Sequence, residues 1–345
     1  MEKVFTTDQA AKFLGVSRVR VRQFIQERRF KATKLGRDYL IAVSELEKFS
    51  QVGRRPTGRP CKNALVGAAA KPDQRQLAEF TTQTRNGVIH HGDVLKVLAG
   101  YADQQFQTII ADPPYFQVLT EHSWDNHWHS QREYLEWTRR WVRACRRVLQ
   151  KDGLLYVFGQ PGKREHLWLH TCSLLATEMQ FHDLIIWDRV VGYNERADSF
   201  TPQYEMILAL RHPECAKPYF NKSVVRIPYD EQTIKRYLRD TRYKNRQARI
   251  EHLKRGKYAT NILRIPSLKG SSREKVGHPS QKPVALIEML VNSSSQRGQM
   301  VLDPFLGSGT TAMACENLGR KWVGIERNAE YVVIAGKRIK QLHKM

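Results

Sequence analysis

One stretch near the carboxyl end decides the fold: Val301-Leu302-Asp303-Pro304-Phe305-Leu306-Gly307-Ser308-Gly309-Thr310-Thr311. An apolar strand leads into a glycine-rich turn, and a helix is expected from Thr310 to about Leu318. Glycines in such a turn let the backbone approach a ligand closely, and the helix N-terminus favours negative charge. The next strand, 321–325, ends at Glu326, 19 positions after Gly307, where a carboxylate can hold a nucleoside ribose. The stretch predicts a nucleoside-binding unit of an α/β fold.

The same alternation of short apolar runs with amphipathic helices extends over residues 86–340, which indicates an α/β fold with a largely parallel sheet. The pattern lapses across residues 213–275 and then resumes. In such a sheet, ligands bind at the carboxyl ends of the strands. The expected strands are 88–90, 108–111, 154–158, 184–187, 206–210, 300–302 and 321–325.

A second motif, Asp112-Pro113-Pro114-Tyr115, follows the expected strand 108–111. An exocyclic amine of a nucleic-acid base is a poor nucleophile because its lone pair is delocalised into the ring. The Asp112 carboxylate and the Pro113 carbonyl can accept both amine hydrogens, and proline adds no competing N–H. Tyr115 offers a ring on which a base flipped out of its helix can stack. The motif predicts an activated amine that attacks directly, without a covalent enzyme intermediate.

The charge of the chain is concentrated in two segments. The formal net charge is +23. Residues 1–62 contain 15 Lys and Arg against 6 Asp and Glu, and residues 211–275 contain 18 against 6. Two basic segments beside a nearly neutral core are typical of surfaces that neutralise phosphates. Nucleic acid is therefore the expected partner.

The first 52 residues predict a small DNA-binding unit. Thr6 can cap a first helix with Gln9 at its third position, and Ser17 can cap a second helix. Ribbon residues 37–41 and a third helix from Ser44 follow. This order resembles a winged helix-turn-helix of the MerR/excisionase type, whose second helix enters the major groove. The resemblance implies DNA contacts by Arg18 and Arg22.

Residues 53–85 are expected to form a linker. The run 53–62 is rich in Pro, Gly and Arg, which favours neither helix nor strand. Its core, Gly58-Arg59-Pro60, resembles an AT-hook, in which the extended Arg59 would reach into a narrow minor groove. A plain basic linker is an equally good interpretation of this run.

The motifs together resemble those of amino-directed DNA methyltransferases. The stretch that ends in Thr311 is similar to the family's S-adenosylmethionine motif, and Gly277-His278-Pro279-Ser280-Gln281-Lys282-Pro283 to its segment over the methionine end of the cofactor. The catalytic motif precedes the basic insert and the cofactor motif, as in the β group. The resemblance implies cofactor contacts by Asp93, His278, Lys282, Pro283, Asp303, Pro304, Phe305, Gly307, Ser308, Gly309, Thr310 and Glu326, and catalytic contacts by Asp112, Pro113, Pro114 and Tyr115.

The resemblance implies a Rossmann-like, S-adenosylmethionine-dependent methyltransferase sheet with a basic inserted target-recognition region and a small N-terminal winged helix-turn-helix domain. The insert would contact DNA through Arg236, Arg239, Arg242, Tyr243, Lys244 and Arg246. We expect a helix-turn-helix domain over 1–52, a linker over 53–85, a catalytic part over 86–212, a target-recognition region over 213–275 and a cofactor-binding part over 276–345.

The expected function is site-specific methylation of the N6 amino group of adenine in double-stranded DNA after base flipping, because Asp-Pro-Pro-Tyr is the family's usual adenine form. N4-cytosine methylation is the alternative. A DNA-binding regulator with an inactive methyltransferase domain is disfavoured by intact Asp112, Tyr115, Asp303 and Gly307. A cognate restriction endonuclease is a second candidate partner. We expect a cytoplasmic, nucleoid-associated monomer or homodimer that binds neither membrane nor metal.

Overall fold

The computed structural model describes residues 4–14, 16, 21–22, 24–25, 32–35, 38–51, 81–116, 127–160, 165–192, 195, 197–240, 242 and 245–342. The chain divides into two compact units, residues 1–71 and 72–345. Each unit has its own arrangement of helices and strands. Among the described residues, no helix is long and apolar enough to cross a membrane.

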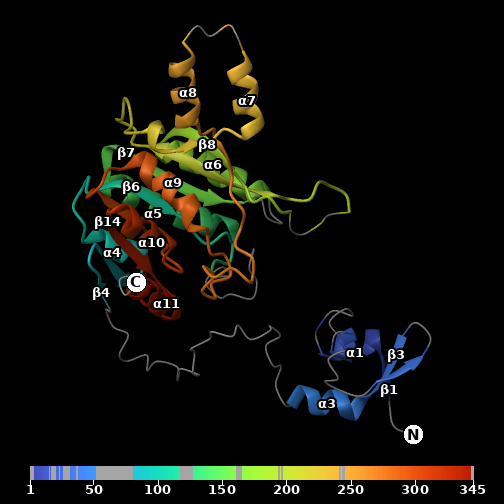
Figure 1. Ribbon diagram of the computed structural model, residues 1–345. Coiled ribbons are helices and arrows are strands. Elements are labelled where there is room, and N and C mark those ends of the chain that lie inside the picture. The colour runs from blue at the N-terminus through green and yellow to red at the C-terminus, as the bar shows by residue number, and fades with distance from the viewer. Residues whose placement is uncertain are drawn as a thin grey trace. The chain divides into compact units, whose positions relative to one another are not determined.

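The first unit has short strands and helices around one small core. Thr6 and Gln9 form the expected capping box, since the Thr6 N–H donates to Gln9 Oε1 (2.9 Å) and the Gln9 N–H to Thr6 Oγ1 (3.3 Å). The third helix begins at Val43, one residue before the expected Ser44. Arg22 is helical and half-buried, and Arg18 lies outside the described residues. The elements are β1 (Val4–Thr6), α1 (Thr7–Leu14), β2 (Thr33–Leu35), β3 (Asp38–Ala42) and α3 (Val43–Gln51), with strand order β1-β3-β2 (Figure 1).

The second unit is built on a nine-stranded sheet within the described residues, with the order β12-β8-β9-β7-β6-β13-β14-β5-β4. The central pairings β6–β7, β6–β13, β13–β14 and β14–β5 are parallel, and β12 pairs parallel with β8. The strands are β4 (Thr81–Gln83), β5 (Gly87–His91), β6 (Phe106–Ala111), β7 (Leu149–Gly159), β8 (Gln180–Asp188), β9 (Tyr204–Arg211), β12 (Ile262–Arg264), β13 (Met300–Asp303) and β14 (Lys321–Glu326).

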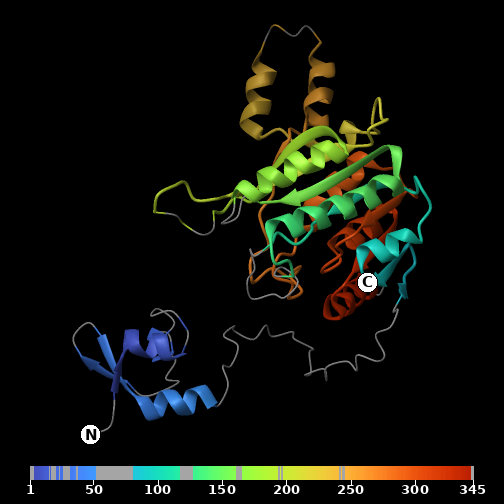
Figure 2. The same ribbon diagram turned by 180° about the vertical axis from the view of Figure 1, so that it is seen from behind.

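Helices cover both faces of this sheet because its central strands are apolar on both sides. Ile110 and Tyr156 join one core with helices α9 (Val284–Ser294), α10 (Thr310–Leu318) and α11 (Ala329–Leu342). Ile109 and Leu155 join the other core. Successive residues of a strand point to opposite faces, so neighbours separate into two cores. The second core contains α4 (Val94–Ala99), α5 (Gln131–Val148) and α6 (Glu165–Glu178), as the reverse view shows (Figure 2).

The sheet begins earlier than expected. β4 lies inside the range 53–85 that was expected to be linker, and it pairs antiparallel with β5. The sequence Thr81-Thr82-Gln83 shows no apolar alternation, so no pattern predicted a strand there. An edge strand can nevertheless be polar, since its backbone still forms hydrogen bonds with the neighbouring strand. The range 53–85 is therefore not linker throughout, because the nine-stranded sheet already includes Thr81–Gln83.

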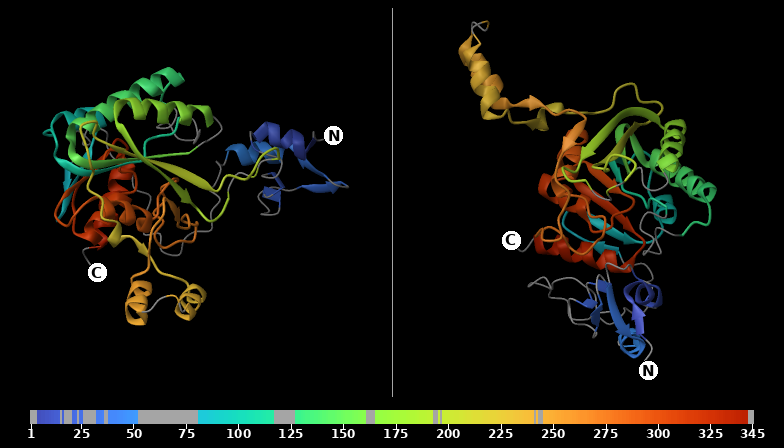
Figure 3. Two further views of the ribbon diagram at one scale, coloured as in Figure 1. Left: turned by 90° about the horizontal axis from the view of Figure 1, so that it is seen from above. Right: turned by 90° about the vertical axis from the view of Figure 1, so that its right-hand side faces the viewer.

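The basic insert forms a hairpin of two helices. α7 (Glu231–Arg239) and α8 (Arg246–Arg255) stand side by side and project away from the sheet (Figures 1 and 3). Asp230 caps α7 by accepting from the Thr233 N–H (2.8 Å), and Asn245 caps α8 by accepting from the Ala248 N–H (2.9 Å). A two-stranded ribbon of β10 (Arg226–Ile227) and β11 (Lys257–Tyr258) forms the base of the hairpin.

Candidate active site

A large cavity lies where the central strands end. Its volume is about 1180 Å³, above the roughly 300–1,000 Å³ of ordinary small-molecule pockets. Residues after β5, β6, β7, β13 and β14 line it, so it occupies the edge at which such sheets bind ligands. The cavity brings the two sequence motifs together and has room for more than one small ligand.

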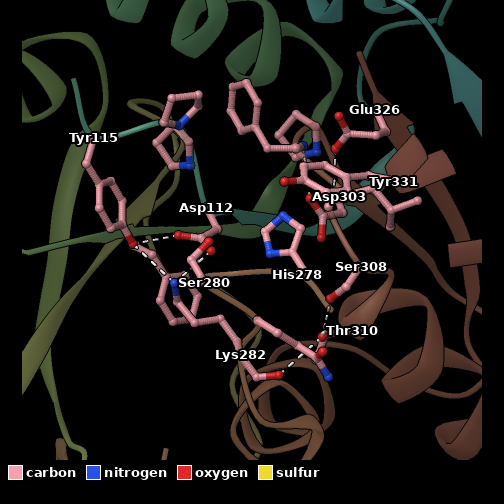
Figure 4. A pocket seen from close by; sticks show the side chains of 18 of the residues that line it. Asp112, Tyr115, His278, Ser280, Lys282, Asp303, Ser308, Thr310, Glu326 and Tyr331 are labelled. Atoms are coloured by element: carbon pink, nitrogen blue, oxygen red, sulfur yellow. Dashed lines mark hydrogen bonds and ion pairs between the residues drawn. The ribbon is translucent and has the colours of Figure 1, made fainter. Parts of the chain in front are cut away.

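The catalytic motif is fixed by hydrogen bonds at the floor of this cavity. The Tyr115 hydroxyl donates to Asp112 Oδ1 (2.5 Å), and the Lys282 ammonium donates to Asp112 Oδ2 (2.7 Å). Figure 4 shows Tyr115 and Asp112 directed toward each other. Each carboxylate oxygen has two lone pairs, so both retain the capacity to accept one more hydrogen. The arrangement holds Asp112 in one orientation while leaving it able to accept from a ligand.

Aromatic side chains support the turn that carries the motif. The Tyr134 hydroxyl donates to the Pro114 carbonyl (2.9 Å), and Tyr134 stacks on Phe116 with ring centroids 5.6 Å apart. Phe116 has a φ of 60°, a left-handed conformation that costs energy in a bulky residue. Trp128 packs against both rings. This packing stabilises the sharp turn after Pro114.

Two residues outside both motifs extend the charge network. Glu205, at the start of β9, lies 3.4 Å from Lys282 Nζ through Oε2 and 3.5 Å from Arg189 Nη1 through Oε1. The side chains of Glu205, Lys282 and Arg189 are 10, 7 and 12% exposed. A buried charge needs a partner of opposite sign, and two cations here balance two carboxylates. Sequence patterns missed Glu205 and Arg189; the one signal was a carboxylate directly before the apolar run 206–210.

The network determines how its members are protonated. Burial alone would lower the pKa of Lys282, but the Asp112 and Glu205 carboxylates outweigh it and raise this pKa above its ordinary value. Burial, followed by the charge of Asp112, raises the pKa of Tyr115 well above its ordinary value. Lys282 therefore stays an ammonium and Tyr115 a neutral hydroxyl donor around neutral pH.

The glycine-rich loop has the left-handed conformation that its composition predicts. Gly307 has a φ of 51° and Gly309 a φ of 81°. A Cβ on Gly307 would lie 3.1 Å from His278 Nε2. The Gly307 N–H donates to Glu326 Oε2 (2.8 Å), and the Asn328 N–H to Glu326 Oε1 (2.7 Å). Backbone N–H donors fix Glu326 at the cavity wall, and an ionised carboxylate only accepts hydrogen bonds, so the cradle fits a nucleoside with free hydroxyls.

Asp303 is a second carboxylate at the glycine-rich end of the cavity. It accepts from the Phe305 N–H (2.9 Å). Burial raises its pKa from 3.8 to about 7. A carboxyl group with this pKa changes its charge near neutral pH, and a bound cation would favour its ionised form.

Lys282 and Thr310 connect the two halves of the cavity. The Thr310 hydroxyl donates to the Lys282 carbonyl (3.2 Å), and the buried Arg338 donates to Thr310 Oγ1 (3.1 Å). Arg338 also donates to the Ser308 carbonyl (3.3 Å) and lies 3.2 Å from Glu274. The Lys282 backbone thus contacts the glycine-rich loop, while its side chain contacts Asp112. No sequence pattern had indicated Arg338.

The other expected cofactor residues take different positions. Asp93 caps α4 by accepting from the Leu95 N–H (3.0 Å) and also lines the cavity. His278 packs edge-on against Tyr331, with centroids 4.3 Å apart. Pro283 and Gly309 precede α9 and α10 as their N-caps rather than lining the cavity. The expected site residues on the cavity wall are Asp93, Asp112, Pro113, Pro114, Tyr115, His278, Lys282, Asp303, Pro304, Phe305, Gly307, Ser308, Thr310 and Glu326.

The expected DNA contacts of the insert lie on the helical hairpin. Arg236, Arg239, Arg242 and Arg246 are exposed there. Arg242 is held by two hydrogen bonds to Asp240, of 3.0 and 2.7 Å. Three further candidates lie outside the described residues: Arg59, Tyr243 and Lys244. The described part of the chain contains no group of three His, Cys, Asp or Glu side chains arranged to hold a metal ion.

Fold and site together define the class of the protein. A solved structure with the same fold is PvuII DNA methyltransferase (cytosine-N4-specific), with a TM-score of 0.54 and 18% identity over 76% of this chain and 93% of that chain. At this identity the likeness shows the fold alone, and that fold is the α/β fold of a methyltransferase.

The family follows from the sequence comparisons. The family model of the N6/N4 methyltransferases, described as DNA methylase, matches residues 106–337, and a helix-turn-helix domain model matches residues 4–51. The chain therefore belongs to the N6/N4 DNA methylase family and carries an N-terminal helix-turn-helix domain.

Curated relatives support this assignment. Type II methyltransferase M1.MboII of Moraxella bovis is 30% identical over 74% of this chain and 96% of its own length. Type II methyltransferase M.HpaI of Haemophilus parainfluenzae is 29% identical over 72% of each chain. The protein is a DNA methyltransferase of the N6-adenine/N4-cytosine class.

Proposed function

We propose that the protein methylates the N6 amino group of adenine in double-stranded DNA, at a specific site, with S-adenosylmethionine as methyl donor. One observation carries the proposal: the Asp112 carboxylate is held by Tyr115 and Lys282 in the same cavity as the glycine-rich loop. Substrate amine and methyl donor can therefore meet in one cavity. Orientation of two reactants is a major source of rate enhancement.

The cofactor side of the cavity suits this donor. S-adenosylmethionine supplies an electrophilic methyl group on a sulfonium. The Glu326 carboxylate suits ribose hydroxyls as an acceptor, and the bare Gly307 backbone allows close approach of the ligand. Asp303 offers a carboxylate to a positively charged group. Asp93, His278, Ser308 and Thr310 complete the wall that we assign to the cofactor.

The catalytic motif suits an exocyclic amine. Asp112 and the Pro113 carbonyl accept the amine hydrogens, which directs the nitrogen lone pair toward the methyl group. Tyr115 and Lys282 keep Asp112 in place during this step. As the new N–C bond forms, the S–C bond to the methyl group breaks and S-adenosylhomocysteine leaves with the electron pair, while the nitrogen loses one proton to Asp112 or to water. A paired base is inaccessible to a cavity floor, so the reaction requires the base to leave the helix.

Adenine is the proposed target because the motif begins with aspartate. In the family that the motifs resemble, Asp-Pro-Pro-Tyr is the usual adenine form and Ser-Pro-Pro-Tyr the usual N4-cytosine form. The N4 amine of cytosine is the alternative substrate, since the two amines have nearly the same chemistry. The assignment to adenine rests on Asp112 rather than on the size of the cavity.

DNA would be held by surfaces outside the cavity. The exposed arginines of the hairpin suit phosphate contacts, and the helix-turn-helix domain offers a second DNA-binding unit. A direct test is to incubate the protein with S-adenosylmethionine labelled in its methyl group and with duplex DNA, structured RNA or denatured protein. We expect label in DNA alone. Label confined to RNA or protein, or transferred to none of the three, would refute the proposed function.

A further inference from the structure

One connection beside the cavity exposes an unusual group of apolar side chains. Residues 189–203 join β8 to β9, and at this connection Val191 and Tyr204 are 43 and 40% exposed. Phe200 is 96% exposed, more than any other large apolar side chain in the described part of the chain. Neither sequence motif includes these residues. Several exposed apolar side chains gathered at one connection are typical of a surface that another molecule covers.

The connection is held firmly where it leaves the sheet. The Arg189 N–H donates to the Gln203 carbonyl (3.0 Å), and the Arg189 guanidinium to the Pro202 carbonyl (3.2 Å). Gln203 donates to Asp188 Oδ1 (2.8 Å). A Cβ on Gly192 would lie 2.6 Å from Thr201 Cγ2, so the two arms are closely packed there. The two arms project from the body and form the β8–β9 hairpin, which is distinct from the helical hairpin of α7 and α8 (Figures 1 and 2).

The base of this hairpin forms part of the cavity wall. Arg189, Pro202 and Glu205 line the cavity that contains Asp112. Phe200 precedes Pro202 by two positions, and two residues span at most about 7 Å. The Phe200 backbone therefore lies within about 7 Å of Pro202, on the wall of the cavity that is proposed to receive the base. The firm anchoring of Arg189 limits how far the hairpin can move away from that wall.

We propose that Phe200 is a wedge that enters the base stack of DNA at the position vacated by the target base. The inference rests on the proposed function, because only base flipping creates such a gap. Removing a base from the duplex loses its stacking on both neighbours. An inserted apolar side chain replaces part of that stacking, as in proteins that unstack base steps. The same contact covers a ring that is otherwise bare to water.

The test needs a duplex that contains the recognition site, found by sequencing modified bases in a host that expresses the protein. In one duplex the target base is paired, and in a second it faces an abasic position and leaves the stack easily. We expect Phe200→Ala to lower kcat/KM about ten- to a hundredfold on the paired duplex, the range given by base–aromatic stacking. On the second duplex the loss should shrink to threefold or less. Phe200→Trp should retain activity on both.

Leu169→Ala is the matched control, because it also removes an exposed apolar side chain (66% exposed, on α6). It should leave kcat/KM unchanged on both duplexes. Fluorescence of 2-aminopurine at the target position should rise with the wild type and less with Phe200→Ala. Equal activity of Phe200→Ala and wild type on the paired duplex would overturn the wedge, as would an equal loss on both duplexes. Failure of the wild type on both would instead refute the proposed function.

Discussion

The Lys282 ammonium lies 2.7 Å from Asp112 Oδ2 and connects the cofactor segment to the catalytic motif across 170 positions of sequence. The Lys282 carbonyl accepts from Thr310 in the glycine-rich loop. One residue therefore contacts both halves of the site. We infer that ordering of the cofactor loop and orientation of the catalytic carboxylate depend on each other through Lys282.

Replacement of the catalytic carboxylate should abolish turnover without removing the cofactor site. We expect Asp112→Asn to lower kcat at least a hundredfold, because an amide accepts at one position only and cannot take up a proton. Affinity for S-adenosylmethionine should stay within about threefold of wild type in isothermal titration calorimetry. Asp103→Asn, which removes an exposed carboxylate beside Arg147, is the control and should keep full activity. A fully active Asp112→Asn variant would contradict the assignment of Asp112.

Energetic coupling between Glu205 and Lys282 should be measurable. Breaking an isolated buried ion pair costs about 3–5 kcal/mol, and we expect a smaller loss here because Lys282 keeps Asp112 and Glu205 keeps Arg189 as partners. We expect Lys282→Gln and Glu205→Gln each to lower the free energy of unfolding, measured by urea denaturation. The double variant should lose at least about 1 kcal/mol less unfolding free energy than the two single variants lose in sum. A coupling of about this size is usual for residues in contact. Additive losses would show that the two side chains do not interact.

The buried Asp303 should make stability depend on pH in a defined direction. Its pKa is about 7 in the folded state, against an ordinary value of 3.8, so folding takes up a proton between these pH values. Stability must then fall as pH rises through this window and level off above it. We expect wild type to lose up to about 4 kcal/mol relative to Asp303→Asn between pH 4 and 7. Urea denaturation at both pH values would measure the free energy of unfolding of each protein. The same change with pH in wild type and in Asp303→Asn would contradict burial of the ionisable group.

The cradle at Gly307 should tolerate no side chain. At a φ of 51° an alanine costs about 1–2 kcal/mol, and its Cβ would press on His278. We expect Gly307→Ala to weaken S-adenosylmethionine binding at least tenfold. Gly298→Ala is the control, since Gly298 has a φ of 82° but no atom within 4 Å of its added Cβ. The Gly298→Ala variant should be less stable than wild type but bind S-adenosylmethionine with the same affinity. Equal cofactor affinity of the two variants would refute a cofactor role for the Gly307 turn.

The arginines of the helical hairpin, formed by α7 and α8, should contribute to the salt dependence of DNA binding. Each phosphate contact contributes about one unit to the slope of log K against log salt concentration. We expect Arg239→Ala and Arg246→Ala each to reduce this slope by about one in fluorescence anisotropy titrations. Lys321→Ala removes an exposed charge at the amino end of β14, the opposite end of the strand from the cavity, and should leave the slope unchanged. Unchanged slopes for both arginine variants would exclude the hairpin from DNA binding.

Local patterns predicted much of the fold and of the site. Helix α10 has the bounds expected from Thr310 to Leu318, because a glycine turn and an apolar periodicity both lie within a short window. The capping box of Thr6 and Gln9 is confirmed for the same reason. The family assignment confirms the resemblance to the DNA methylases, and the roles of the individual motif residues stay predictions.

Contacts between residues that are distant in sequence could not be predicted from local patterns. Glu205 and Arg189 are single charges at strand ends, and nothing nearby in sequence shows that folding brings them to Lys282. Lys282 itself was assigned to the cofactor, because its segment indicates its backbone position and not the reach of its side chain. β4 was missed because polar edge strands show no apolar alternation. These features depend on tertiary packing, which short-range patterns do not encode.

The central claim is that Asp112 directs methylation to the N6 amine of adenine. Unmethylated duplex DNA should be incubated with the protein and S-adenosylmethionine, digested to nucleosides and analysed by mass spectrometry. We predict N6-methyladenine, formed in proportion to enzyme and absent with Asp112→Asn. N4-methylcytosine in its place, or N6-methyladenine that still forms with Asp112→Asn, would contradict the account.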